Sequence, residues 1–336
     1  MLKILIKLLG AGILFGSLSL AWFIMDFQSF KVTPLVPDGK PFKYRITPGT
    51  SLTRLAHDLD TLGLIDRPRY FIWLAKWQYD NGTIKTGEYQ FSPGTGSADF
   101  LEKIIAGKVI QYPLTIIEGW NFRQLLNAIE KHDKIEHQLT GLTNEEIMRR
   151  LGLDAPSPEG LFSPDTYYVT RHMSDVQLLQ RANQLLNEFL QTSWQQREAG
   201  LPYKTPYEAL IMASIIEKET AAPEERQQIA GVFVRRLQKR MRLQTDPTVI
   251  YGLGETFNGN ITRRDLKTDT PYNTYTRRGL PPTPIAMAGR ESIYAALHPA
   301  SGDALYFVAK GDGTHYFSAT MEEHNRAVKK YQLRKN

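Results

Sequence analysis

The chain contains no cysteine among its 336 residues. This absence excludes disulfide bonds, thiolate nucleophiles, cysteine metal ligands and lipid attachment through a cysteine. It does not fix the compartment, because a protein exported by a bacterium can fold without disulfide bonds.

Several signatures of common enzyme classes are also missing. The sequence has no Walker loop, no dinucleotide-binding glycine fingerprint, no Gly-x-Ser-x-Gly elbow and no His-Glu-x-x-His motif. Its seven histidines are scattered, and for the closest set, His298, His315 and His324, we expect surface or core roles rather than a metal site. The sequence therefore implies no metal and no cofactor.

Dense runs of basic residues are absent too. The 41 Lys and Arg residues are interleaved with 35 Asp and Glu residues, which gives a formal net charge of +6. This balance suits an acidic polymer or an anionic membrane surface, but the interleaving is typical of an ordinary solvated surface. We expect no nucleic-acid partner.

One apolar run is long enough to cross a membrane. It extends over the 22 residues from Ile4 to Met25 and is interrupted only by Lys7, glycine and serine. A helix of this length matches a bilayer core of about 30 Å. Lys3 and Lys7 predict a cytoplasmic N-terminus and a periplasmic remainder at the plasma (inner) membrane. A cleaved signal peptide, with a site at residues 19–21, is the alternative, although the apolar run continues beyond that site.

The next region contains a repeat. Residues 44–50 read YRITPGT, residues 89–95 read YQFSPGT, and a looser third copy begins at residue 114. Each copy is an alternating strand followed by a turn and a helical pattern. Such strand–turn–helix units resemble LysM-type modules, which bind N-acetylglucosamine polymers, but they are also a common way to build an α+β layer. We expect an α+β protein with an anchor helix (1–27), a linker (28–40), a LysM-like subdomain (41–110) and a mixed α+β catalytic domain (111–336).

A buried helix that ends in acidic residues is the strongest chemical signal. Thr205 to Glu208 has the pattern of a capping box with proline at the first helical position, and the following residues are apolar nearly all round. Glu219 lies in the last turn, on the face of the apolar residues three, four and seven positions earlier. Burial and the negative end of the helix both raise the pKa of a carboxyl group, as a general acid requires. The alternative is that Glu217 and Glu219 form ordinary salt bridges.

Long linear motifs around this helix resemble the endolytic murein transglycosylase (MltG/YceG-like) family. One departure is Thr283, where family members often carry a smaller residue. The similar segments run almost to the C-terminus: EGLFSPDTY (159–167), ASIIEKET (213–220), RLQTDPTVIYG (242–252), YNTY (272–275), GLPP (279–282) and HPA (298–300).

The resemblance implies a membrane-anchored lytic transglycosylase that cuts nascent peptidoglycan strands internally, terminating their elongation. Its catalytic glutamate maps onto Glu219, which would act as acid and then base and leave 1,6-anhydro-N-acetylmuramic acid ends. Gln244, Asp246, Asn273 and Tyr275 are predicted substrate contacts because they are polar residues of the motif loops. Asp246 could instead cap a turn and Asn273 hold its own loop. Glu217 is the reserve catalyst.

Two other functions remain open at this level. One is a non-catalytic, membrane-tethered scaffold that binds peptidoglycan and recruits peptidoglycan synthases. The other is a muramidase that cleaves the same bond with water, for which Asp246 or Glu159 could supply the second carboxylate. In each case the expected partners are glycan strands and the membrane, with synthases as further candidates.

Overall fold

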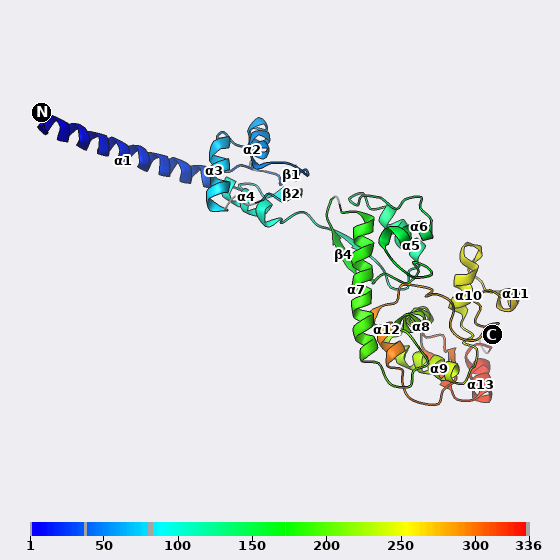
Figure 1. The fold of residues 1–336 in the computed structure, drawn as a ribbon. Helices are drawn as coiled ribbons and strands as arrows, with labels where there is room; N and C mark the ends of the chain where they lie inside the picture. Colours follow the sequence, from blue (N-terminus) through cyan, green and yellow to red (C-terminus); the bar gives the residue numbers. More distant parts are fainter. Residues whose placement is uncertain (1, 37–38, 80–82, 172, 334–336) are drawn as a thin grey trace. The chain divides into compact units, whose positions relative to one another are not determined.

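The computed structural model describes residues 2–36, 39–79, 83–171 and 173–333, and it divides into two compact units. The first contains Met1–Tyr112 with Thr170–His172, and the second contains Pro113–Val169 with Met173–Asn336. Each mixes helices and strands (Figure 1), which confirms the predicted combination of α and β structure. The division at residue 112 lies two residues from the predicted start of the catalytic domain.

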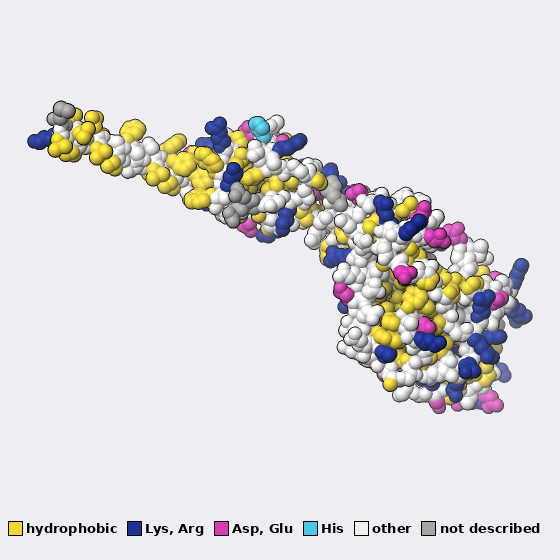
Figure 2. Space-filling model, in the orientation of Figure 1, with side chains coloured by type: hydrophobic (Ala, Val, Ile, Leu, Met, Phe, Trp, Pro, Cys, Tyr) yellow, Lys and Arg dark blue, Asp and Glu magenta, His cyan; other side chains and the backbone are white. Residues whose placement is uncertain are grey.

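The first unit begins with a single long helix, α1 (Leu2–Val32). By length and composition it could cross a membrane, and none of the side chains in its apolar window is buried. Figure 2 shows hydrophobic side chains along much of this helix, with basic residues near its free end. These properties are compatible with a membrane anchor.

The C-terminal end of α1 packs into the first unit. Phe27 and Phe30 are buried in its core, and the Asp26 carboxylate accepts hydrogen bonds from Arg67 at 2.6 Å and from Tyr70 at 3.1 Å. Leu35 and Val36 are buried as well. Residues 28–36, expected to form a free linker, are therefore helical or packed because they carry apolar side chains into the core. Residues 37–38 of that linker lie outside the described part of the chain.

Two copies of the repeat, with helix α3 between them, form most of the rest of this unit. Strands β1 and β2 pair antiparallel, with Tyr44 opposite Tyr89. In each copy a glycine with positive φ follows the strand, Gly49 at 80° and Gly94 at 79°, a conformation that other residues adopt at a cost. The elements are β1 (Phe42–Ile46), α2 (Leu52–Thr61), α3 (Pro68–Gln78), β2 (Gly87–Phe91) and α4 (Ser97–Ala106).

The second unit contains the third copy of the repeat, β3 and α5, followed by the predicted helices and a C-terminal hairpin. Strands β3 and β4 form one two-stranded sheet, and β5 and β6 form another. The elements are β3 (Tyr112–Thr115), α5 (Phe122–Glu130), α6 (Asn144–Leu151), β4 (Thr166–Val169), α7 (Asp175–Gln195), α8 (Pro206–Glu219), α9 (Arg226–Gln238), α10 (Asp246–Leu253), α11 (Arg263–Lys267), α12 (Arg290–Leu297), β5 (Tyr306–Ala309), β6 (His315–Ser318) and α13 (Met321–Tyr331), with short 3-10 turns at Pro223–Glu225 and Gly254–Thr256.

Helix α8 is the centre of the second unit. Residues 209–216 are all buried, and α7, α9 and α12 pack around them. Thr205 caps the helix by accepting a hydrogen bond from the Glu208 amide at 3.2 Å. The Glu208 carboxylate accepts from the Lys204 amide rather than from Thr205, so the predicted capping box is only half formed. Because neighbouring helices cover α8 on nearly every side, its last turn and the residues there are held in a fixed position.

Candidate active site

Glu219 is the last residue of α8, and the backbone turns into an extended conformation at Thr220. The Glu219 side chain is partly buried, and its Oε1 accepts a hydrogen bond from the Thr245 hydroxyl. Thr245 is itself 2% exposed. The carboxyl group is therefore held from one side by a buried residue of a distant loop.

A cavity of about 490 Å³ opens at this carboxyl group. We call it the Glu219 cavity. It brings together four of the five residues that the sequence singled out: Glu219, Gln244, Asp246 and Tyr275. The remaining walls come from α9, the β5–β6 hairpin and α13, with Arg236, Tyr306, His315, His324 and Asn325 among the lining residues.

The surroundings raise the pKa of Glu219 to about 7. Burial is the main cause, and the negative charge of Asp246 adds to it. The Thr245 hydrogen bond and the electrostatic interactions with His315 and Arg236 act in the opposite direction but do not outweigh burial. Near neutral pH a substantial fraction of Glu219 is therefore protonated and able to donate a proton.

The loop before α10 supplies the residues that face Glu219. Gln244 has a φ of 52°, a left-handed conformation that is uncommon for residues other than glycine. The neighbouring loop holds this turn: the Gln244 amide donates to the Thr274 carbonyl at 3.2 Å, and the Thr245 amide donates to the Thr274 hydroxyl at 3.1 Å. The strained turn directs two consecutive residues, Thr245 and Asp246, towards the site.

Tyr275 and Asp246 form a pair in the cavity wall. The Tyr275 hydroxyl donates to Asp246 Oδ1 at 2.5 Å, and burial together with this contact raises the pKa of the tyrosine. Tyr275 therefore remains a neutral donor at physiological pH and fixes the orientation of a carboxylate beside Glu219.

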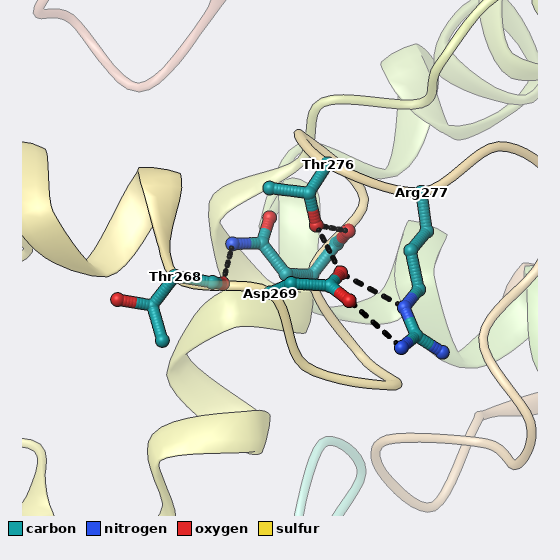
Figure 3. A network of polar contacts seen from close by, with 5 residues as sticks. Thr268, Asp269, Thr276 and Arg277 are labelled. Atoms are coloured by element: carbon teal, nitrogen blue, oxygen red, sulfur yellow. Dashed lines mark hydrogen bonds and ion pairs between the residues drawn. The ribbon is translucent and has the colours of Figure 1, made fainter.

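Asn273 does not line the Glu219 cavity. It is 1% exposed, its amide nitrogen donates to the Thr268 carbonyl at 2.7 Å, and its Oδ1 accepts from the Tyr275 amide at 2.9 Å. In the same loop Asp269 accepts hydrogen bonds from Thr276 and from two nitrogens of Arg277 (Figure 3). The contacts fit the alternative in which Asn273 holds the loop that carries Tyr275.

The other two acidic candidates also lie outside this cavity. Glu217 Oε2 accepts a hydrogen bond from the Gly289 amide at 2.9 Å, at the beginning of α12. Glu159 is buried and accepts from the Phe122 amide and from the Tyr251 hydroxyl, both at 3.1 Å. Of the carboxylates proposed as a second catalytic group, only Asp246 lines the cavity that contains Glu219.

Three residues that act on Glu219 were not among the site residues predicted from the sequence. Thr245 belongs to the motif of residues 242–252 and directly precedes Asp246. This position is the one sequence signal that could have identified it. Arg236 is buried and comes from α9, and His315 comes from β6, where its Nδ1 lies 2.7 Å from Glu225 Oε2. No sequence pattern connects α9 and β6 with residue 219, because only packing brings them together.

Known proteins are similar to this chain over the segments that form the candidate site. The sequence pattern of the YceG-like family matches residues 44–330. The chain is 31% identical over 322 residues to an endolytic murein transglycosylase of Bacillus subtilis, covering 90% of this chain and 88% of that protein. It is 25% identical over 360 residues to an endolytic murein transglycosylase of Streptococcus pneumoniae, covering 97% of this chain and 63% of that protein.

A solved structure is similar as well. The crystal structure of a putative YceG-like protein from Listeria monocytogenes matches 85% of this chain and 99% of its own, at 31% identity and a TM-score of 0.53. The family match over residues 44–330 includes Glu219 and every other residue that lines its cavity up to Val328. Because the family pattern matches most of its length, this chain is a member of the YceG-like family.

Proposed function

We propose that this protein is a murein transglycosylase that cuts peptidoglycan glycan strands internally, with Glu219 as its acid and base. The observation that carries the proposal is a glutamic acid of raised pKa, fixed by Thr245 at the end of a buried helix and open to a cavity lined by polar side chains. The names of the Bacillus and Streptococcus relatives support the same reaction class.

The proposed reaction needs one carboxyl group and no water. Protonated Glu219 donates its proton to the oxygen that joins C1 of N-acetylmuramic acid to the next N-acetylglucosamine, and the C1–O bond breaks. The resulting Glu219 carboxylate accepts the proton of the muramic C6 hydroxyl while that oxygen bonds to C1. A 1,6-anhydro ring forms, and Glu219 is again protonated.

The other lining residues have distinct proposed roles. Asp246, oriented by Tyr275, stabilises positive charge that develops at C1 and raises the pKa of Glu219 through its own charge. Gln244 is an exposed residue of the loop before α10 and lines the Glu219 cavity. It is a proposed contact for the acetamido or hydroxyl groups of a sugar. Asn273 acts indirectly by holding the loop that carries Tyr275.

We further propose that α1 anchors the protein in the plasma membrane with its N-terminus in the cytoplasm and the chain that follows α1 on the periplasmic side. The length and composition of α1 and the positions of Lys3 and Lys7 support this orientation. The strand–turn–helix units of residues 41–110 are proposed to bind glycan in the manner of LysM modules, and peptidoglycan synthases are proposed partners.

A hydrolytic muramidase is the second candidate, because Asp246 lies in the Glu219 cavity and could activate water. Mass spectrometry of products released from uncrosslinked peptidoglycan distinguishes the two reactions. The proposed lyase gives anhydromuramoyl ends, which are one water lighter than reducing ends. Reducing ends would identify a hydrolase. Intact strands, with folded protein and verified substrate, would contradict both enzymes and favour the binding scaffold.

Replacing Thr245 with valine should move the pH profile of the reaction. The Thr245 hydroxyl donates to Glu219 and stabilises its charged form, so its loss should raise the pKa of Glu219 above about 7. Because the proton donor must be protonated, activity falls as the pH rises through this pKa. The alkaline limb of kcat/KM should therefore shift to higher pH, while Thr245→Ser should leave it in place. An unchanged limb in the valine variant would contradict this role of the hydrogen bond.

A further inference from the structure

A second cavity, of about 800 Å³, adjoins the Glu219 cavity within the same unit. We call it the Glu159 cavity after the buried acid in its wall. At two places consecutive residues line different cavities: Lys218 and Pro247 line this one, whereas Glu219 and Asp246 line the other. The end of α8 and the beginning of α10 thus lie between the two cavities.

Aromatic side chains form part of the wall of the Glu159 cavity. Tyr251, Phe257 and Tyr272 all line it. The Tyr251 hydroxyl bonds to Glu159 at 3.1 Å, and the Tyr272 hydroxyl bonds to the Thr283 hydroxyl at 2.9 Å. Because the protein uses both hydroxyl groups, the rings are what these residues offer to a ligand. Aromatic rings pack well against the apolar face of a pyranose ring.

Amide side chains supply hydrogen-bond donors in the same wall. Asn121 and Gln124 each use the side-chain oxygen to accept the other's backbone N–H in the capping box of α5, at 2.9 Å in both directions. Their NH₂ groups remain as donors, and Asn144 at the beginning of α6 adds a third amide. Sugar hydroxyl and acetamido groups accept hydrogen bonds of this kind.

The charged residues in the wall have protein partners. Arg123 pairs with Glu255, Lys218 Nζ donates to the Gly119 carbonyl at 3.2 Å, and Glu159 accepts from the Phe122 amide and Tyr251. Lys218 keeps its positive charge because its partner is a neutral carbonyl, so a ligand meets aromatic rings, amides and one ammonium group. The rings and amides fit the apolar face and the polar groups of a sugar unit.

We propose that the Glu159 cavity binds sugar units of the same glycan strand whose cleaved bond lies in the Glu219 cavity. The inference rests on the proposed function and specifies how an internal cut is made. A strand cut away from its ends must be held on both sides of the bond, and a second cavity beside the first gives the strand room to continue. Glu159 is then a positioning residue that fixes Tyr251 and the beginning of α5.

The test measures binding by the full chain in detergent micelles, in a Glu219→Gln background so that the strands stay intact. Asn144→Trp fills the Glu159 cavity from an exposed position, and Arg150→Trp is its control on the exposed face of the same helix, away from the cavity. The probes are long, uncrosslinked glycan strands stripped of stem peptides, and a tetrasaccharide of the same repeat. We expect Asn144→Trp to weaken strand binding about tenfold and tetrasaccharide binding less than twofold.

Phe257→Ala provides a second variant should the tryptophan disturb folding, and it should also weaken strand binding selectively. Unchanged strand affinity in both variants would overturn the inference, as would an equal loss for strands and tetrasaccharide. Competition by free stem peptide, lost in Asn144→Trp, would reassign the cavity to peptide and overturn it too. Selective loss of strand binding, together with a parent chain that cleaves nothing, would support the inference while refuting the proposed reaction.

Discussion

Replacing Glu219 with glutamine should reduce the release of anhydromuramoyl products by about a thousandfold or more. Glutamine keeps the size of the side chain and can still accept the Thr245 hydrogen bond, but it has no proton to donate to the leaving oxygen. The measurement is the rate of product formation from uncrosslinked strands by the full chain in detergent, quantified by mass spectrometry, with strand binding measured in parallel.

Glu217→Gln is the matched control for this experiment. It lies two residues earlier in the same helix, its carboxylate accepts from the Gly289 amide, and it does not line the Glu219 cavity. We expect its activity to stay within about fivefold of the parent, since a glutamine oxygen can still accept from the Gly289 amide and only the 4.0 Å ion pair with Arg226 is lost. Full activity in Glu219→Gln would refute the assignment, and a comparable loss in Glu217→Gln alone would make that residue the catalyst.

Replacing Arg236 with methionine should destabilise the second unit by about 3 kcal/mol, because buried carbonyl groups lose their donor. Arg236 is 7% exposed. Its guanidinium donates to the carbonyls of Leu243 and Leu305, each at 2.6 Å, and lies over the Tyr306 ring at 5.1 Å. This one side chain therefore joins the loop before α10 to the beginning of the β5–β6 hairpin.

Thermal unfolding by circular dichroism is the appropriate measurement, and a loss of this size should lower Tm by roughly 10 °C. Lys239→Met, at the exposed end of the same helix, serves as the control and should change Tm by less than about 2 °C. A near-normal Tm for Arg236→Met would mean that water replaces the guanidinium. It would also show that the two segments do not depend on this side chain for their positions.

Several features of the fold could be predicted because their signals are local. The apolar run at the N-terminus, the turns at Gly49 and Gly94 and the cap at Thr205 each depend on residues within a few positions of one another. The placement of residues 28–36 could not be predicted in this way. The proline and glycine that follow indicate a break, whereas the burial of Phe30, Leu35 and Val36 depends on helices far along the chain.

In the candidate site, too, some features follow from local sequence signals and others depend on long-range packing. The sequence by itself determined that α8 would be buried and that Glu219 would end it, because helical periodicity and caps are short-range properties. Only the tertiary structure decided which groups surround that carboxyl: it placed Asp246 and Tyr275 in the cavity, left Asn273 and Glu159 outside, and added Thr245, Arg236 and His315. The physical reason is that burial and charge act over a few ångströms in space, and residues separated by up to 96 positions in this chain come that close only when the helices and the hairpin pack together.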